Sequence, residues 1–235
     1  LLLKLEPTQQ TGAVDGVQPL PQLPAAEKLL PEPVATVLSE ENTELLDLAE
    51  YAFDDGDWMP EEEILRIDNA FREKLGYPLR MEALAQPYTE TEEEKAVHLL
   101  RLRFTIEAQV PADQVTLAME HIEDAELFWN RQKVKTPVSG WFTDECIRKK
   151  VLGKLQKGTN LLEIRIPFRK KTNVEWCYLL GSFGVTVCGR KKKIVDAPAV
   201  VQYGDYTQQA LPFYAGNLSY LIEENFEAGE LHLEI

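Results

Sequence analysis

Alternation of apolar and polar residues dominates the second half of the chain. From Leu100 to Val110, apolar residues occupy every even position and polar residues every odd one. A helix would scatter these apolar residues over all its faces, whereas a strand places them on one side. Shorter runs of the same kind, separated by turn residues, follow at 115–119, 125–130, 162–168, 176–180, 185–187 and 218–222. This spacing predicts a mainly β fold, an antiparallel β-sandwich or jelly roll.

A helical period interrupts the pattern once, near the start of this region. One apolar helix face is formed by residues at i, i+3, i+7 and i+11, namely Ile64, Ile67, Phe71 and Leu75. Pro60 and three glutamates precede this face, as is typical of a first helical turn, and Gly76 follows it, as is typical of a helix end. The sequence therefore predicts one inserted amphipathic helix over about 60–76, with Asp57 as its candidate cap.

The two ends of the chain differ from its centre. Residues 6–38 contain six prolines and no sustained period, which predicts an irregular linker. Leu1–Leu5 resembles the last strand of an upstream element, and Leu231–Ile235 alternates like a strand that is cut from a longer polypeptide. We therefore expect a fragment of a larger protein. Residues 1–39 would be a strand end plus a linker, and residues 40–235 one β-sandwich domain, truncated at its C-terminus.

Charge and composition exclude several classes of protein. The chain has 39 acidic and 25 basic residues and a net charge of −14. Residues 1–100 hold 22 acidic and 7 basic residues (−15), and residues 101–235 hold 17 and 18 (+1). Because phosphate recognition depends on clustered Lys and Arg, this balance argues against a nucleic-acid partner. A membrane partner is not expected either, since no apolar stretch reaches the roughly 18 residues of a bilayer span. The three cysteines form no CxxC motif, which predicts buried free thiols and favours a cytoplasmic location.

Motifs for metals, nucleophiles and phosphates are not found. His98, His121 and His232 are far apart and lack the spacing of zinc ligands. The acidic residues in Asp54–Asp57 do not follow the order of a calcium loop, so a helix-capping turn is the preferred interpretation and a loop-bridging structural calcium the alternative. Gly181–Gly184 lacks the G-x-S-x-G order of a nucleophilic serine. No cofactor is expected.

Aromatic residues beside Asp and Asn in the predicted loops point to carbohydrate. A sugar presents apolar C–H faces flanked by hydroxyls, so its site requires an aromatic platform with polar side chains nearby. The candidate carbohydrate-binding residues are Trp141, Asp144, Asp205, Tyr206, Tyr214 and Asn217. The alternative is that these aromatics extend from the core to the rim of the sandwich. Trp176 alternates with polar residues of a predicted strand and is expected in the core.

Several of these segments resemble one family. They are Gly140–Asp144, Leu155–Phe168, Thr172–Val185, Tyr203–Asn217, and Leu65–Asp68 with Arg72 and Gly76. Together, over about residues 42–220, they resemble the accessory sugar-binding-type β-sandwich of large bacterial glycoside hydrolases, which is related to the jelly-roll domains of glycoside hydrolase family 2 and to galactose-binding-like domains.

The resemblance implies a non-catalytic module that packs against the catalytic domain of the same polypeptide and contacts carbohydrate. The family's catalytic acids are expected upstream, so no catalytic residue is assigned. Two alternatives stay open: a ligand-free structural sandwich, and a self-contained hydrolase that uses carboxylates of this chain. One position departs from the family pattern, because Asn130 is followed by Arg131 where the hairpin turn favours glycine. A different turn type is therefore expected there.

Overall fold

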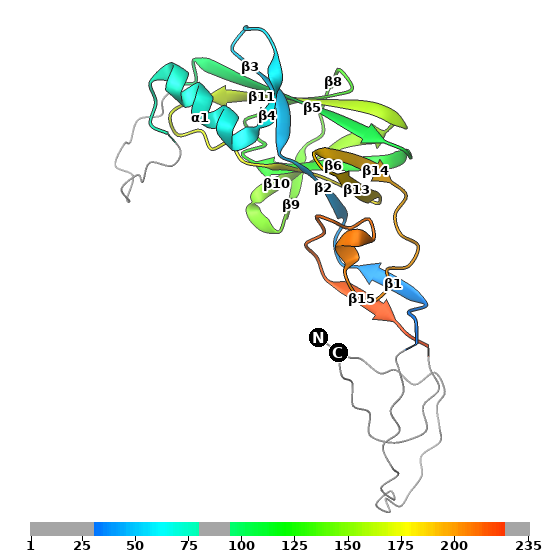
Figure 1. The fold of residues 1–235 in the computed structure, drawn as a ribbon. Coiled ribbons are helices and arrows are strands. Elements are labelled where there is room, and N and C mark those ends of the chain that lie inside the picture. The colour runs from blue at the N-terminus through cyan, green and yellow to red at the C-terminus, as the bar shows by residue number, and fades with distance from the viewer. Residues whose placement is uncertain (1–30, 80–94, 224–235) are drawn as a thin grey trace, which may run out of the picture. The chain divides into compact units, whose positions relative to one another are not determined.

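The computed structural model describes residues 31–79 and 95–223, and these form three β-sheets, two of which face each other (Figure 1). The strands predicted at Leu1–Leu5 and Leu231–Ile235 lie outside the described residues, as does the linker up to residue 30. Among the described residues α1 (Ile64–Leu75) is the one α-helix. The predicted mainly β sandwich with one helix is confirmed.

One layer is a five-stranded antiparallel sheet in the order β2-β12-β6-β10-β9. Its strands are β2 (Asn42–Leu46), β6 (Ala112–Glu120), β9 (Val138–Phe142), β10 (Asp144–Leu155) and β12 (Cys177–Gly181). The layer opposite has the order β13-β14-β5-β11-β7-β8, with β3 and then β4 added beside β5. Its strands are β3 (Leu48–Phe53), β4 (Met59–Glu63), β5 (His98–Ala108), β7 (Glu126–Trp129), β8 (Gln132–Lys133), β11 (Gly158–Phe168), β13 (Gly184–Cys188) and β14 (Lys191–Val195).

The core lies between the two layers and follows the alternation seen in the sequence. Every second residue of the central strands is buried in one apolar cluster, which includes Leu100, Leu102, Phe104 and Ile106 of β5, Leu162, Ile164, Ile166 and Phe168 of β11, and Val115, Leu117 and Met119 of β6. Strand β5 pairs with β11 in unbroken register from Ala108↔Gly158 to His98↔Phe168. The long period-2 run therefore forms the centre of the sandwich, as predicted.

The helix begins later than the sequence predicts. Met59–Glu63 is strand β4, which pairs with β3, and the register shift in this pair falls where Pro60 has no N–H to donate. The cap is Glu63 and not Asp57, because the Glu63 carboxylate accepts a hydrogen bond from the Arg66 N–H at 3.1 Å. Gly76 ends the helix in the left-handed conformation, with φ +67°, as its position predicts. The buried face of α1 extends the core through Phe71, which stacks on Phe53 at 4.3 Å between ring centroids.

The predicted linker ends earlier than expected, because a short strand lies within it. Residues Ala35–Leu38 form β1, which pairs with β15 (Leu218–Leu221) in a two-stranded ribbon. One face of this ribbon packs Leu38 and Leu218 against a small separate core. Prolines dominate the composition of 6–38, and they obscure the segment of five residues after Pro33, of which four are apolar.

The β7–β8 hairpin has the two-residue turn that the sequence argued against. Asn130 and Arg131 both have positive φ, +48° and +68°, as in a type I′ turn. Tertiary contacts impose this geometry: the Asn130 side chain accepts from the Leu161 N–H at 2.9 Å and donates to Asn160 Oδ1 at 3.0 Å. The expectation of a different turn type was wrong, since these contacts outweigh the preference for glycine.

A buried carboxyl makes stability depend on pH. Glu44 on β2 is 3% exposed, and burial raises its pKa to about 7 against the attraction of Lys192. Because the folded state holds this proton more tightly than the unfolded state, stability from this group is full below about pH 4.5 and is lost as pH rises through about 7.

Replacing Glu44 with glutamine should remove this dependence. As pH rises from about 4.5 to 8, wild type loses the contribution of Glu44 and the variant does not. The difference in free energy of unfolding, variant minus wild type, is therefore expected to increase by about 3 kcal/mol over this range. Urea titrations of both proteins at several pH values measure this difference. Parallel pH profiles for the two proteins would contradict the prediction.

Candidate functional site

One end of the sandwich brings together three connections that are far apart in the sequence. In the five-stranded sheet, Glu120 at the end of β6 lies opposite Ile147 near the start of β10, and Arg148 lies opposite Trp141 of β9. On the other side of β6, Tyr178 near the start of β12 lies opposite Ala118. The β6–β7 turn, the β9–β10 hairpin and the β11–β12 loop therefore meet at this end.

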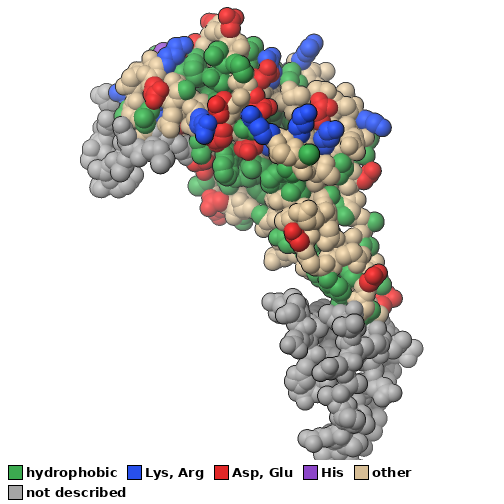
Figure 2. All heavy atoms as spheres, in the orientation of Figure 1, with side chains coloured by type: hydrophobic (Ala, Val, Ile, Leu, Met, Phe, Trp, Pro, Cys, Tyr) green, Lys and Arg blue, Asp and Glu red, His purple; other side chains and the backbone are tan. Residues whose placement is uncertain are grey.

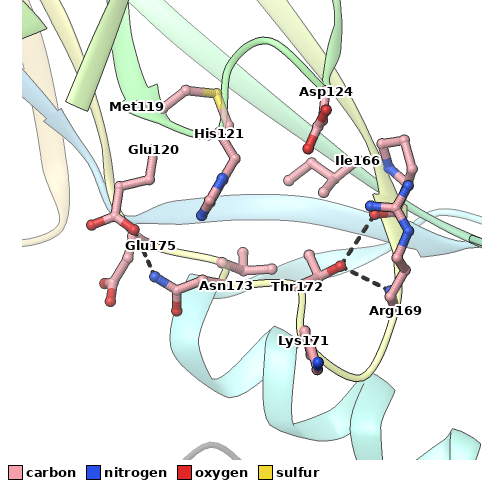
Figure 3. A pocket seen from close by; sticks show the side chains of 12 residues that line it. Met119, Glu120, His121, Asp124, Ile166, Arg169, Lys171, Thr172, Asn173 and Glu175 are labelled. Atoms are coloured by element: carbon pink, nitrogen blue, oxygen red, sulfur yellow. Dashed lines mark hydrogen bonds between the residues drawn. The ribbon is translucent and has the colours of Figure 1, made fainter. Parts of the chain in front are cut away.

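A pocket of about 130 Å³ opens between the β6–β7 turn and the β11–β12 loop (Figure 3). This is about four times the share of liquid volume of one water, roughly 30 Å³. Its apolar lining comes from Met119, Ile166, Pro167 and Val174, and its polar lining from Glu120, His121, Asp124, Arg169, Lys171, Thr172, Asn173 and Glu175. An apolar floor with a polar rim is the usual composition of a small-molecule site.

The β11–β12 loop is fixed by its own hydrogen bonds. The Thr172 hydroxyl accepts from the Arg169 N–H at 2.8 Å and donates to the Pro167 carbonyl at 3.3 Å. The Asn173 amide donates to the Glu120 carboxylate at 2.6 Å, which ties the loop to β6 across the pocket. This wall of the pocket is therefore a defined structure (Figure 3).

A buried ion pair joins the same loop to the helix. Arg72 of α1 donates through Nε to both carboxylate oxygens of Asp68, at 3.0 and 3.1 Å. Its Nη1 and Nη2 donate to the carbonyls of Lys170 and Thr172 at 2.8 and 2.5 Å. Asp68 is 0% and Arg72 6% exposed. Through Arg72, the helix thus holds the β11–β12 loop, which forms one wall of the pocket.

The opposite wall is a turn in a strained conformation. His121 has φ +52°, in the left-handed region that residues other than glycine rarely adopt. The turn closes with a hydrogen bond from the Asp124 N–H to the His121 carbonyl at 3.1 Å, and it is anchored by Ile122, which is fully buried. With Ile122 in the core, His121 and Asp124 are exposed on either side of it.

Two exposed tryptophans lie at the same end of the sandwich, outside the residues that line the pocket. Trp176 follows the pocket residue Glu175 and is 40% exposed, and its indole N–H donates to Glu63 at 2.9 Å. The prediction that Trp176 is a core residue was wrong, because β12 begins one residue later and buries Cys177 instead. Trp141 is 50% exposed on the edge strand β9. Its Cα is two strand spacings from Met119, or roughly 10 Å.

The six predicted contact residues divide into two groups. Trp141 lies at the pocket end with Asp144, whose pKa is lowered by a hydrogen bond from the Cys146 N–H at 2.8 Å. The other four, Asp205, Tyr206, Tyr214 and Asn217, lie in the segment beside the start of β2. Strand β12, which spans the sheet between these ends, covers roughly 13 Å.

Most of the second group serves local structure. Tyr214 is 6% exposed, and its hydroxyl donates to the Asn217 carbonyl at 2.7 Å, so its ring is not available to a ligand. Asp205 caps the 3₁₀ helix η1 (Tyr206–Gln208) by accepting from the Thr207 N–H at 2.9 Å. The Thr207 side chain and backbone donors lower the pKa of this carboxyl. Tyr206 remains 37% exposed.

Sequence reasoning missed the pocket residues. They lie on two connections about 45 positions apart, and they include no Phe, Trp or Tyr that would indicate a sugar platform. One local signal was present, because two polar residues flank the single apolar Ile122 in a polar turn after a strand. The loop residues Thr172 and Asn173 were noted in the family resemblance, but without a role.

Metal ligation and membrane insertion find no support in the described part of the chain. Residues 31–79 and 95–223 contain no group of three or more His, Cys, Asp or Glu that could hold a metal ion. The carboxylate of Asp54 instead accepts from the Leu99 N–H at 2.7 Å. Within the same ranges no helix is long and apolar enough to cross a membrane.

The three cysteines are free, and only Cys177 is buried, which corrects the expectation of three buried thiols. Burial raises the pKa of the Cys177 thiol to about 12, so it is not a nucleophile.

The pocket, with its apolar floor and polar rim, has the composition of a binding site for a small polar molecule. No protein-family model matches this chain, and no curated protein matches it significantly.

Proposed function

We propose that this chain is a non-catalytic accessory β-sandwich of a multidomain glycoside hydrolase, and that it binds carbohydrate at its pocket end. The observation that carries the proposal is the pocket itself, which has an apolar floor and a polar rim and opens at the end of the sandwich that carries two exposed tryptophans. The resemblance in sequence to accessory domains of glycoside hydrolases agrees with this proposal. The catalytic domain of the same polypeptide is then the expected packing partner.

The chemistry of the lining suits a neutral sugar. Each hydroxyl of a sugar ring both donates and accepts, so its site needs donors and acceptors interspersed around an apolar surface. The pocket supplies acceptors from carboxylates and donors from Arg169 and the imidazole of His121. Acidic and basic side chains are also mixed over the face of the molecule in Figure 2, which does not favour a strongly charged ligand.

A self-contained hydrolase is less well supported. General acid catalysis requires a carboxyl with a raised pKa within reach of the substrate. Glu44 has a raised pKa, but it is 3% exposed and lies outside the pocket lining. Substrate could not reach it, so this group does not provide the chemistry.

Alanine substitutions at the two ends of the sandwich test the proposal. Trp141→Ala and Trp176→Ala are each expected to weaken glycan binding roughly 10-fold, because a ring face that covers a sugar contributes at least about 1.4 kcal/mol. Tyr206→Ala, which removes a similarly exposed aromatic ring at the other end, should leave binding unchanged. A glycan array followed by calorimetric titration measures these affinities.

Two results would contradict the proposal. If the wild-type chain binds no glycan, the module is the ligand-free sandwich named above. If only Tyr206→Ala weakens binding, carbohydrate binds at the other end. Each variant should remain folded, because all three side chains are partly exposed and none belongs to a buried core cluster.

A further inference from the structure

Two side chains of the β6–β7 turn point into the pocket. In Figure 3 the Asp124 carboxylate extends toward Ile166 and the His121 ring toward the β11–β12 loop, whereas Lys171 points away toward α1. Among the described residues, neither His121 nor Asp124 has a hydrogen-bond partner for its side chain. Glu120 and Thr172 are engaged, since Glu120 accepts from Asn173 and Thr172 bonds within its own loop, while Nε of Arg169 has no partner among the described residues. His121 and Asp124, together with Nε of Arg169, are therefore the polar groups of this lining that can bind a ligand, and the first two come from one turn.

The backbone of this turn is held in a costly conformation. A left-handed φ at a residue with a Cβ costs about 1–2 kcal/mol, which glycine would avoid. Such strain persists where the surrounding structure fixes it, and it is concentrated at functional sites. Here the buried Ile122 and the closing hydrogen bond from Asp124 fix the turn, so that two side chains three residues apart face the same space. Of the six described residues other than glycine that have positive φ, His121 is the one that lines this pocket.

We propose that His121 and Asp124 are the specificity-determining pair of the pocket and that they form hydrogen bonds with two adjacent hydroxyls of a neutral pyranose. This inference rests on the proposed function. The two oxygens of the Asp124 carboxylate accept one hydrogen bond from each hydroxyl, and an N–H of the His121 ring donates to one hydroxyl oxygen. Hydrogen bonds to a charged acceptor are stronger than neutral ones and depend on geometry. The ring's C–H face lies on Ile166 and its apolar neighbours.

This arrangement predicts selectivity for the diol. A pyranoside that lacks either hydroxyl leaves one carboxylate oxygen without its donor and should bind roughly 10- to 100-fold more weakly. Sugars that keep the diol but differ at remote positions should bind with similar affinity. The pocket is then selective for a diol and tolerant elsewhere.

The test uses the whole chain and a defined set of probes. The probes are methyl glycosides of neutral hexoses, together with the monodeoxy analogues of the best-bound hexoside, measured by calorimetric titration. Asp124→Asn and His121→Gly should bind the parent hexoside roughly 10- to 100-fold more weakly and lose discrimination against the deoxy analogue. His121→Gly should also raise the midpoint of thermal unfolding, by about 2–4 °C, because the strain is relieved. A merely structural role for His121 would not combine higher stability with weaker binding.

A matched control is Arg131→Gly, in which a second left-handed residue, outside the pocket lining, is relieved of the same strain. It should gain stability and bind as wild type. If His121→Gly and Asp124→Asn both keep wild-type affinity while Trp141→Ala or Trp176→Ala loses it, the inference fails and the proposed function stands. If wild type binds none of the hexosides, the proposed function fails and the inference fails with it.

Discussion

Replacing Arg72 with methionine is expected to lower the free energy of unfolding by about 3–5 kcal/mol. The substitution removes the guanidinium that donates to both oxygens of the Asp68 carboxylate, which is 0% exposed, and it removes donors from the carbonyls of Lys170 and Thr172. Denaturant unfolding measures the loss. Arg66→Met is the matched control on the same helix, because the guanidinium of Arg66 is 78% exposed and lies 3.8 Å from Glu62. That variant should change stability by about 0.5 kcal/mol or less.

A double variant separates the buried charge from the lost contacts. Asp68→Leu combined with Arg72→Met removes both members of the ion pair, so much of the loss should be recovered. If Arg72→Met costs no more than Arg66→Met, the ion pair does not hold the helix to the β11–β12 loop. The pocket wall would then require another support.

Replacing Asn160 with leucine is expected to cost about 2–5 kcal/mol, since each of two donors left unsatisfied costs about 1–3 kcal/mol. Asn160 is fully buried, and its Oδ1 accepts from the Gln156 N–H and from Asn130 Nδ2, both at 3.0 Å. Its Nδ2 donates to the Gln156 carbonyl at 2.7 Å. Thermal or denaturant unfolding measures the change.

The neighbouring Thr159→Val is the control for Asn160→Leu. Thr159 is exposed, and its hydroxyl donates to Glu107 at the surface, so this variant should stay within about 0.5 kcal/mol of wild type. Equal effects of the two variants would show that the buried amide does not hold the β7–β8 hairpin to β11.

The sequence predicted the strands of the sandwich well, and it failed where tertiary contacts decide. Leu100–Val110 alternates for eleven residues, and one buried face is the physical cause of that pattern, so the strand could be predicted directly. The start of the helix could not, because Pro60 suits a first helical turn and a register shift in a strand pair equally well. The turn at Arg131 depends on Asn160, thirty residues away, and a local turn rule has no access to that contact.

The candidate site was predicted only in part. Trp141 and Asp144 were predicted because an aromatic ring beside a carboxylate is a local signal, and they lie at the pocket end of the sheet but outside the pocket lining. His121 and Asp124 carry no such signal. They line the pocket only because the fold places their turn opposite a loop some fifty residues away in the sequence. Tyr214 carried the signal but is used in packing, and burial is not readable from a loop sequence.

Nuclear magnetic resonance titration of the chain with the methyl hexosides tests the central claim most directly, because it reports which end of the sandwich responds. Binding at the pocket predicts that amide shift changes concentrate at residues 119–124 and 169–176, with the indole N–H signals of Trp141 and Trp176 among them. Shift changes confined to residues 201–217, or no change at saturating hexoside, would contradict the account.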